Sequence, residues 1–168
     1  MKKLIICAFC AFFGLTAAQA QAKFGHVNSQ EIIQAMPEFN AARTEIENLT
    51  KQYDADLQQM QEELQKKGEA FEKEQATLPE NIKQRRQQEL QDLYQRIQQT
   101  YQDNQQALAK AQQDKMQVIT TKVLDAVKTI GQEGGFVYIM ETGAGIPYIS
   151  TTLSTDVTAQ VKAKLGLK

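Results

Sequence analysis

The sequence predicts a mainly α-helical protein in which a long antiparallel helical hairpin projects from a small β-containing body. Two long middle segments carry apolar residues at helical spacing, and a short proline-containing break separates them. β-branched and aromatic runs typical of strands lie near the two ends of the chain. We therefore expect residues 21–37 and 131–168 to form the body, and residues 38–130 to form the hairpin, with its tip near residues 77–81.

The first residues have the three parts of a secretory signal peptide. Two lysines are followed by an apolar run over residues 4–18 and by the small-residue pattern Ala18-Gln19-Ala20. The run is shorter than the roughly 20 residues that cross a bilayer. We expect residues 1–20 to be removed after Ala20, with Ala22 as the alternative cleavage site, and the mature chain to be exported to the periplasm.

The composition supplies few of the residues that enzymes and metal sites commonly use. Both cysteines lie in the predicted signal segment, and His26 is the only histidine, on a predicted strand where a structural role is more common. The formal net charge is −1, which does not favour nucleic-acid binding. The glycine clusters lack the flanking motifs of phosphate loops, and turn geometry accounts for them. We therefore expect no catalytic, cofactor or metal site and no nucleic-acid partner.

The first elements of the body are short. Residues 23–28 are expected to form a strand that includes Phe24 and Val27. Ser29 then has the chemistry of an N-cap for a helix over Gln30–Ala35. Pro37 ends this helix and opens the next one, because proline disfavours helical conformation in the preceding residue but suits the first turn.

The first arm of the hairpin has a narrow apolar stripe with mostly polar residues elsewhere. The extra step of four between Tyr53 and Leu57 is a stutter in the heptad pattern. Residues 38–77 would extend about 60 Å at about 1.5 Å per residue. The stripe consists of Phe39, Ala42, Ile46, Leu49, Tyr53, Leu57, Met60, Leu64 and Phe71.

The second arm is predicted to start near Pro79, where Thr77 and Glu80 match a capping box. Gly131 is the expected helix stop. Two such amphipathic helices with a tight break should pair in antiparallel fashion. The second stripe consists of Ile82, Arg86, Leu90, Tyr94, Ile97, Tyr101, Asn104, Leu108, Ala111, Lys115, Ile119, Val123, Val127 and Ile130.

Glutamine is unusually frequent in this second arm. Residues 84–117 contain 13 glutamines, a composition that is also found in aggregation-prone disordered segments. Apolar residues nevertheless recur every three or four positions through the same stretch, and this spacing favours a solvated helix face.

The C-terminal end is predicted to form a β-hairpin and a last helix. Residues 136–140 are expected to be a strand, 141–145 a turn and 146–150 a second strand. Ser154 or Thr155 would then cap a helix over residues 156–165, which Gly166 would end. The long hairpin returns the chain to its start, so that the N-terminal strand can join these strands.

A body of this size is close to the lower limit for an independent domain, so we expect it to associate through its sheet into a closed symmetric oligomer. The residues expected to make this interface are Phe24, Val27, Phe136, Val137, Ile139, Tyr148 and Ile149.

The order of these parts, with the motifs V-N-S-Q-E-I-I at Val27–Ile33, F-V-Y-I-M at residues 136–140 and P-Y-I-S at residues 147–150, resembles the Skp/OmpH family of periplasmic chaperones. A T-x-x-V pattern at Thr158–Val161 adds to the resemblance. The resemblance implies a jellyfish-shaped homotrimer whose hairpins hold unfolded outer-membrane β-barrel proteins without ATP. It thus implies two kinds of partner, such unfolded proteins and further copies of the chain.

The charge of the arms differs from that of the family's basic members. Residues 38–130 carry 13 Lys and Arg against 16 Asp and Glu, and only the tip is weakly basic. This makes contact of the tip with a membrane surface or lipopolysaccharide doubtful. The alternative function is a structural coiled-coil spacer or adaptor of the cell envelope. If the chain is a chaperone, we expect client contacts at Phe71, Leu78, Ile82 and Leu93, unless these residues only complete the packing of the hairpin.

Overall fold

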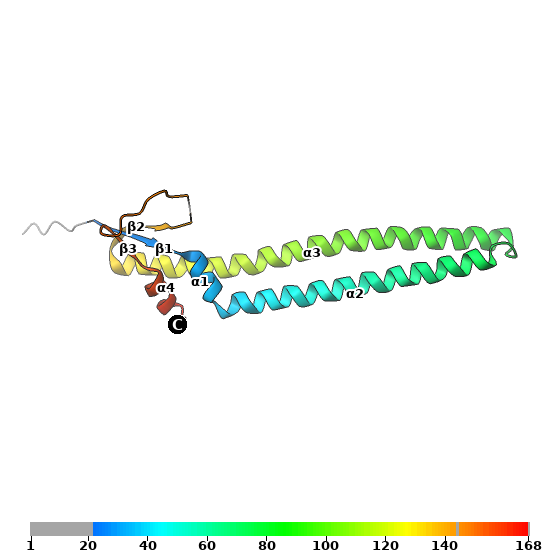
Figure 1. Ribbon diagram of the computed structural model, residues 1–168, viewed down its shortest axis with the longest axis horizontal. Coiled ribbons are helices and arrows are strands. Elements are labelled where there is room, and N and C mark those ends of the chain that lie inside the picture. The colour runs from blue at the N-terminus through cyan, green and yellow to red at the C-terminus, as the bar shows by residue number, and fades with distance from the viewer. Residues whose placement is uncertain (1–21, 144, 168) are drawn as a thin grey trace, which may run out of the picture.

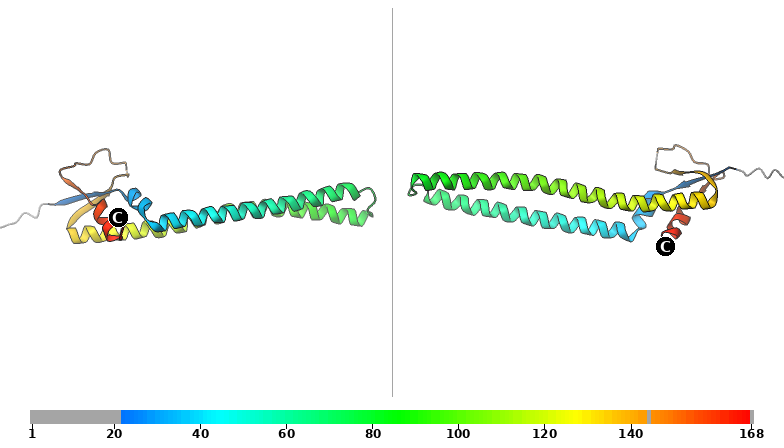
Figure 2. Two further views of the ribbon diagram at one scale, coloured as in Figure 1. Left: turned by 60° about the horizontal axis from the view of Figure 1, so that its bottom comes forward. Right: turned by 180° about the vertical axis from the view of Figure 1, so that it is seen from behind.

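The computed structural model describes residues 22–143 and 145–167, and it is dominated by two long helices. Helix α2 spans Pro37–Glu74 and helix α3 spans Glu80–Gly134, and the two lie side by side in antiparallel orientation (Figure 1). Helix α3 is the longer, with 55 residues against 38, and it continues past the start of α2 to lie beneath a small sheet (Figure 2). The predicted long hairpin is confirmed. The expected cleavage site after Ala20 lies outside the described residues.

The turn at the hairpin tip differs in detail from the expected capping box. The Thr77 hydroxyl donates to the Glu74 carbonyl at 2.9 Å, which satisfies an acceptor at the end of α2. Pro79 occupies the N-cap position of α3, with φ −57° and ψ 145°, and no side chain caps that helix. The predicted reciprocal bonds between Thr77 and Glu80 are therefore wrong, because the threonine hydroxyl serves the preceding helix.

Helix α3 also ends later than expected. Gly131 lies within the helix, which continues to Gly134. The chain leaves the helix at Gly135, whose φ of 65° is left-handed and whose N–H bonds to the Gln132 carbonyl at 3.3 Å. The expected stop at Gly131 is wrong because the third glycine of the cluster, and not the first, adopts the left-handed conformation that ends a helix.

Both ends of the chain meet in one three-stranded sheet. Strand β1 spans Lys23–Val27 and lies in the centre, between β2 (Phe136–Glu141) and β3 (Ser154–Asp156). Both pairings are parallel, and the register with β2 shifts after Lys23. The expected sheet formed by both termini is confirmed, but the expected β-hairpin of residues 136–140 and 146–150 is wrong.

The reason lies in the topology of the sheet. Because β2 and β3 both run parallel to β1, the chain must cross back between them, and a tight two-strand turn cannot make that connection. The described residues between β2 and β3, 142–143 and 145–153, form no further strand before Ser154; Gly145 there has a φ of 74°, and Pro147 lacks a donor for a ladder. The third strand therefore forms only at Ser154, further along the chain than expected.

Two short helices complete the body. Helix α1 spans Ser29–Ala35 and is capped by Asn28, not by Ser29, because the Asn28 carboxamide oxygen accepts from the Glu31 N–H at 3.0 Å. Helix α4 spans Thr158–Lys164, so the expected start at residue 156 is wrong. The residues expected to cap it instead form β3.

The core of the body lies where α1, α4 and the C-terminal part of α3 meet the sheet. Helix α3 contributes three of its residues, the N-terminal segment three and the C-terminal segment two, so both ends of the chain are needed to complete it. The buried cluster consists of Val27, Ile32, Met36, Ile119, Val123, Ala126, Val157 and Val161.

Candidate functional site: contact surfaces of the body and the hairpin

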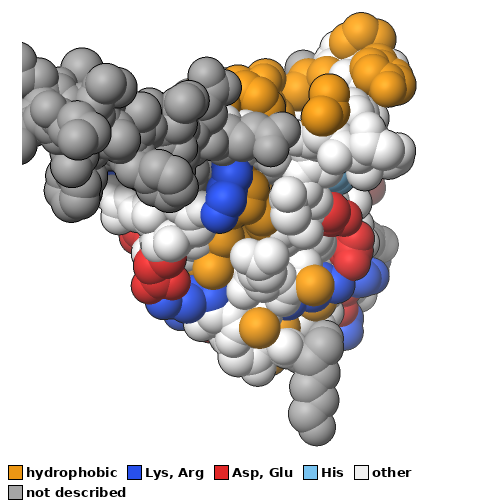
Figure 3. Space-filling model, turned by 90° about the vertical axis from the view of Figure 1, so that its left-hand side faces the viewer, with side chains coloured by type: hydrophobic (Ala, Val, Ile, Leu, Met, Phe, Trp, Pro, Cys, Tyr) orange, Lys and Arg blue, Asp and Glu red, His pale blue; other side chains and the backbone are white. Residues whose placement is uncertain are grey.

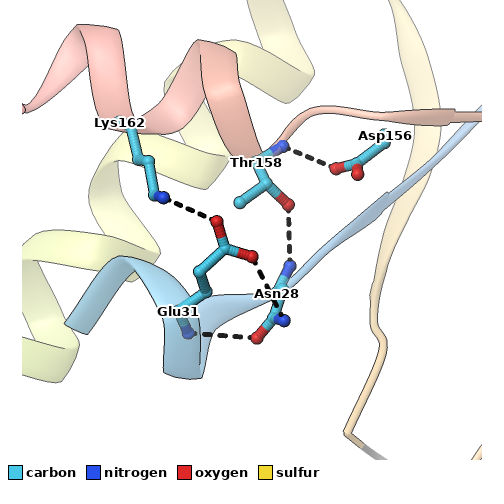
Figure 4. Close-up of polar contacts among 5 residues, drawn as sticks. All are labelled: Asn28, Glu31, Asp156, Thr158 and Lys162. Atoms are coloured by element: carbon cyan, nitrogen blue, oxygen red, sulfur yellow. Dashed lines mark hydrogen bonds and ion pairs between the residues drawn. The ribbon is translucent and has the colours of Figure 1, made fainter. Parts of the chain in front are cut away.

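A polar cluster, drawn in Figure 4, ties the N-terminal segment to the C-terminal one. The Asn28 N–H donates to the Thr158 hydroxyl at 3.0 Å, and the Thr158 N–H donates to Asp156 Oδ1 at 2.9 Å. Lys162 pairs with Glu31 at 2.6 Å, and the Lys162 side chain is only 21% exposed. We call these five residues the terminal clasp. Because Thr158 is buried, the clasp adds directional bonds to an otherwise apolar contact between the chain ends.

The electrostatics of the clasp favour an ionised Asp156. The hydroxyl of Thr158 holds the pKa of Asp156 below its usual value, against the opposing effect of burial, and the Thr158 backbone N–H and the charge of His26 act in the same direction as the hydroxyl. His26 itself bonds through Nδ1 to the Ser154 hydroxyl at 2.8 Å. The single histidine therefore connects β1 to β3, a structural position.

The outer face of the sheet, turned away from the core, carries an exposed apolar surface. The rings of Phe24 and Tyr138 lie with centroids 4.9 Å apart and planes tilted by 32°. A hollow of about 280 Å³ lies over these strands. It is bordered by Met140 of β2 and by residues that follow β2 in the chain, Tyr148 and Leu153 among them. Figure 3 views this end of the molecule and shows hydrophobic side chains gathered along its upper part. We call this surface the outer sheet face.

The residues expected at an oligomer interface divide between this face, the side of β2 next to α3, and the core. Tyr148 is 78% exposed on the outer sheet face, whereas Val137, 64% exposed, borders a hollow beside Gly131 of α3. Phe24 and Ile149 are half-buried and line the hollow of the outer sheet face. The remaining three residues point to the interior of the chain and pack in or against the core cluster: Val27, Phe136 and Ile139.

The hairpin is tightly packed at two places. Leu93 and Ile97 are buried toward the tip, and Ile119, Val123 and Ala126 are buried toward the body, whereas α2 has no buried residue. Salt bridges cross between the helices near the body, from Lys122 to Glu38 at 2.8 Å and from Lys115 to Glu45 at 2.7 Å. Such exposed pairs contribute little to stability, so apolar contacts at the two ends hold the arms together.

The middle of the hairpin is packed less well. Asn104 lies in the predicted stripe, and its side-chain nitrogen is buried without a hydrogen-bond partner among the described residues. Tyr101, which the sequence places in the seam between α2 and α3, is 54% exposed, and so is Tyr94 nearer the tip. The seam near the tip uses Leu93 instead of its neighbour Tyr94, because a leucine fits the narrow space between two helices and a tyrosine keeps its hydroxyl in water.

The four residues expected to contact clients therefore occupy different environments. Phe71, Leu78 and Ile82 surround the turn at the tip and are half-buried, so each still presents apolar surface to solvent. Leu93 is only 5% exposed and packs in the seam between the helices. The structure thus gathers three of the four at the tip and separates the fourth from them.

Among the described residues, no group of three or more His, Cys, Asp or Glu side chains is placed to hold a metal ion. Within residues 22–143 and 145–167, no helix is both long enough and apolar enough to cross a bilayer.

Sequence reasoning missed the terminal clasp and part of the outer sheet face. Asn28 and Thr158 are 130 positions apart, and no local pattern connects them. Met140 and Leu153, 43% and 70% exposed, belong to the outer sheet face but were not singled out. Met140 could have been found from its position in the strand, since it alternates with Ile139 across the faces of β2.

These features define a class of elongated proteins in which a helical hairpin projects from a body closed by both chain ends. A family model described as outer membrane protein (OmpH-like) matches residues 23–165, and the chain belongs to this family. A crystal structure of a protein from Caulobacter crescentus, described as an outer membrane chaperone (OmpH-like), has a TM-score of 0.73 at 16% identity. The match covers 92% of this chain and 89% of that one, which shows a shared fold. Comparison with curated protein sequences gives no match.

Proposed function

We propose that the protein is a trimeric, ATP-independent holdase of the periplasm that binds unfolded outer-membrane β-barrel proteins. The observation that carries this proposal is a hairpin of 38- and 55-residue helices that projects from a body closed by the two chain ends. Three such hairpins on one assembled body would enclose a space large enough for an unfolded chain. The membership in the OmpH-like family supports the same function.

The packing of the arms fits weak and distributed binding. Their best apolar contacts are used between α2 and α3, so only limited apolar surface remains for a client at any one point. Binding spread over many weak contacts allows a client to leave without an energy source, because no single contact must be broken at high cost. This is the behaviour that a holdase without a nucleotide needs.

The outer sheet face supports assembly of the trimer. Tyr138, Met140, Tyr148 and Leu153 expose between 43% and 78% of their surfaces on this face. An apolar surface of this kind on a small body is typical of a protein interface. We propose that this face contacts the neighbouring subunits, with the hairpins directed away from it.

The tip supplies a further set of client contacts. Phe71, Leu78 and Ile82 are half-buried around the turn and belong to both arms and the connection between them. We propose that they contact apolar segments of the client at the open end of the assembly. The role in the periplasm requires export, for which the signal segment expected over residues 1–20 provides the route.

The competing function is a structural spacer of the cell envelope, which the long hairpin alone would also serve. An aggregation assay separates the two. A urea-denatured outer-membrane β-barrel protein is diluted into buffer with and without the purified mature chain, in the absence of nucleotide, and light scattering is followed. A holdase keeps the diluted protein soluble at near-stoichiometric amounts, whereas a spacer leaves its aggregation unchanged.

A further inference from the structure

One exposed face of α3 carries no charge over a long distance. At about 100° per residue, six residues spaced along this helix fall within about 60° of one another around its axis. We call them the amide–tyrosine strip: Tyr94, Gln98, Tyr101, Gln105, Gln112 and Met116. All six are exposed. From Tyr94 to Met116 the strip is about 33 Å long at about 1.5 Å per residue.

The charges of the same stretch are on the other side of the helix. Arg96, Asp103, Lys110 and Asp114 fall about 160° to 200° away from Tyr94 around the axis. The remaining charged residue, Lys115, bonds across the seam to Glu45. A helix face that meets only water has no reason to exclude charge, and the opposite face of α3 does carry charged residues. The strip therefore has the composition of a surface that another molecule covers.

The glutamines of the strip are not bonded to charged side chains of the same helix, as two glutamines on its charged side are. Gln88 donates to Asp92 at 2.7 Å, and Gln99 donates to Asp103 at 2.8 Å, both on the charged side. Within the described part of the chain, the strip glutamines make no side-chain hydrogen bond to another protein group. Their amides, each with a donor and an acceptor, therefore remain available to a partner.

We propose that the amide–tyrosine strip binds one extended segment of an unfolded β-barrel client through the backbone of that segment. This inference rests on the proposed function. Each residue of an unfolded chain carries a free N–H and C=O, which match the two ends of a glutamine amide. An extended chain rises about 3.3 Å per residue, so the strip accommodates about ten residues, the length of one membrane-spanning strand.

The absence of charge fits this occupant. Membrane-spanning strands alternate apolar and polar residues and present few charges on their lipid side. Covering a carboxylate or ammonium group with such a segment would remove water from the charge without a compensating partner. A row of amides with two tyrosines avoids that cost and accepts many different sequences, because the backbone is common to all of them. The bound client is therefore selected by its unfolded, weakly charged state and not by its sequence.

The test uses two matched triple variants of the full mature chain. The strip variant changes Gln98, Gln105 and Gln112 to Glu, and the control changes their immediate neighbours Gln99, Gln106 and Gln113 to Glu. Both sets have the same spacing and add the same charge, but the control set is turned by about 100° toward the charged side. Binding of a fluorescently labelled, urea-denatured outer-membrane β-barrel protein is measured after dilution, with circular dichroism as the check on helix content.

We expect the strip variant to bind about ten-fold more weakly than the wild type and the control to stay within about two-fold. A second variant, Tyr94→Ala with Tyr101→Ala, should also lose about ten-fold without adding charge. Equal affinities of the strip variant, the control and the wild type would overturn the strip as a client surface while leaving the holdase intact. A wild-type chain that fails to bind would instead remove the proposed function itself. A change in the mass of the client-free strip variant would assign the strip to a subunit contact and overturn the inference.

Discussion

The backbone N–H of Asn28 donates a 3.0 Å hydrogen bond to the hydroxyl of Thr158, a residue 130 positions further along the chain. This bond joins the start of α1 to the start of α4, and Val157 next to it is fully buried in the core. The hairpin contributes Ile119, Val123 and Ala126 of α3 to that core, and the two chain ends contribute its other five residues. The body that carries the arms therefore depends on contacts between the chain ends.

Removing the acceptor of this bond should destabilise the body. Thr158→Val keeps the shape of the side chain but leaves the Asn28 N–H without its partner. We expect a loss of about 1–3 kcal/mol in the free energy of unfolding, since an unsatisfied buried donor costs that amount. Urea unfolding followed by circular dichroism measures the change. The control Thr155→Val, at an exposed position of β3, should differ little from the wild type. Equal stabilities of the two variants would contradict a role for the bond.

The stability of the body should depend on pH through Asp156. Its pKa is lowered in the folded chain, chiefly by the Thr158 hydroxyl, so the ionised group stabilises the fold above its unfolded pKa of about 4. This contribution is lost as the pH falls through the lower, folded pKa. The melting temperature of the wild type should exceed that of Asp156→Asn at about pH 6, and the difference should shrink toward about pH 2. A difference that is independent of pH would show that ionisation of Asp156 is not involved.

Two glycine-to-alanine changes should act in opposite directions. A Cβ at Gly25 would lie 3.1 Å from both Ile139 Cγ1 and the Phe136 ring, against the core side of the sheet. Gly25→Ala is therefore expected to destabilise the protein by about 1–3 kcal/mol through overpacking. A Cβ at Gly68 within α2 would have no neighbour within 4 Å, and Gly68→Ala should stabilise the helix by about 0.5–1 kcal/mol. Thermal unfolding of both variants tests the pair, and a destabilising Gly68→Ala would be inconsistent with an open helix face.

Assembly should respond to charge on the outer sheet face. Tyr148→Glu or Leu153→Glu introduces a carboxylate at a residue that is 78% or 70% exposed in the single chain. We expect either change to convert the proposed trimer to monomers with unchanged helix content, since an interface core disfavours an unpaired charge. Light scattering after size exclusion measures the mass. Phe136→Asp is a poorer test because Phe136 packs against the core, so the variant would unfold the body.

Leu124→Glu is the matched control for this experiment. Leu124 is 58% exposed but lies on α3, away from the outer sheet face. The Leu124→Glu variant should have the same mass in solution as the wild type. Dissociation by Leu124→Glu together with an intact Tyr148→Glu assembly would move the interface from the sheet to the helix.

The helical part of the fold was predictable because its signals are local and repeated. The spacing of apolar residues defined both arms, and Pro37 marked the start of α2 as expected. The prediction of the seam residues was less accurate, since Leu93 and Tyr94 are adjacent and both fit a helical repeat. Only packing against α2 decides that Leu93 is buried and Tyr94 is exposed.

The body was harder to predict because its organisation depends on contacts between distant residues. The composition of residues 146–150 predicted a strand, yet the strand that pairs with β1 begins at Ser154. Likewise, Ser29 and Asn28 both suit an N-cap. The structure uses Asn28, and the Ser29 N–H bonds to the Glu141 carboxylate at 3.1 Å. A single sequence gives no local sign of that choice.

The central claim is that this chain assembles and holds an unfolded β-barrel protein without an energy source. Multi-angle light scattering of the purified mature chain, alone and with a diluted denatured client, tests it most directly. The proposal predicts a trimer alone and, with the client, one soluble species whose mass equals three chains plus one client. A monomer that leaves the client to precipitate, with no species of intermediate mass, would contradict it.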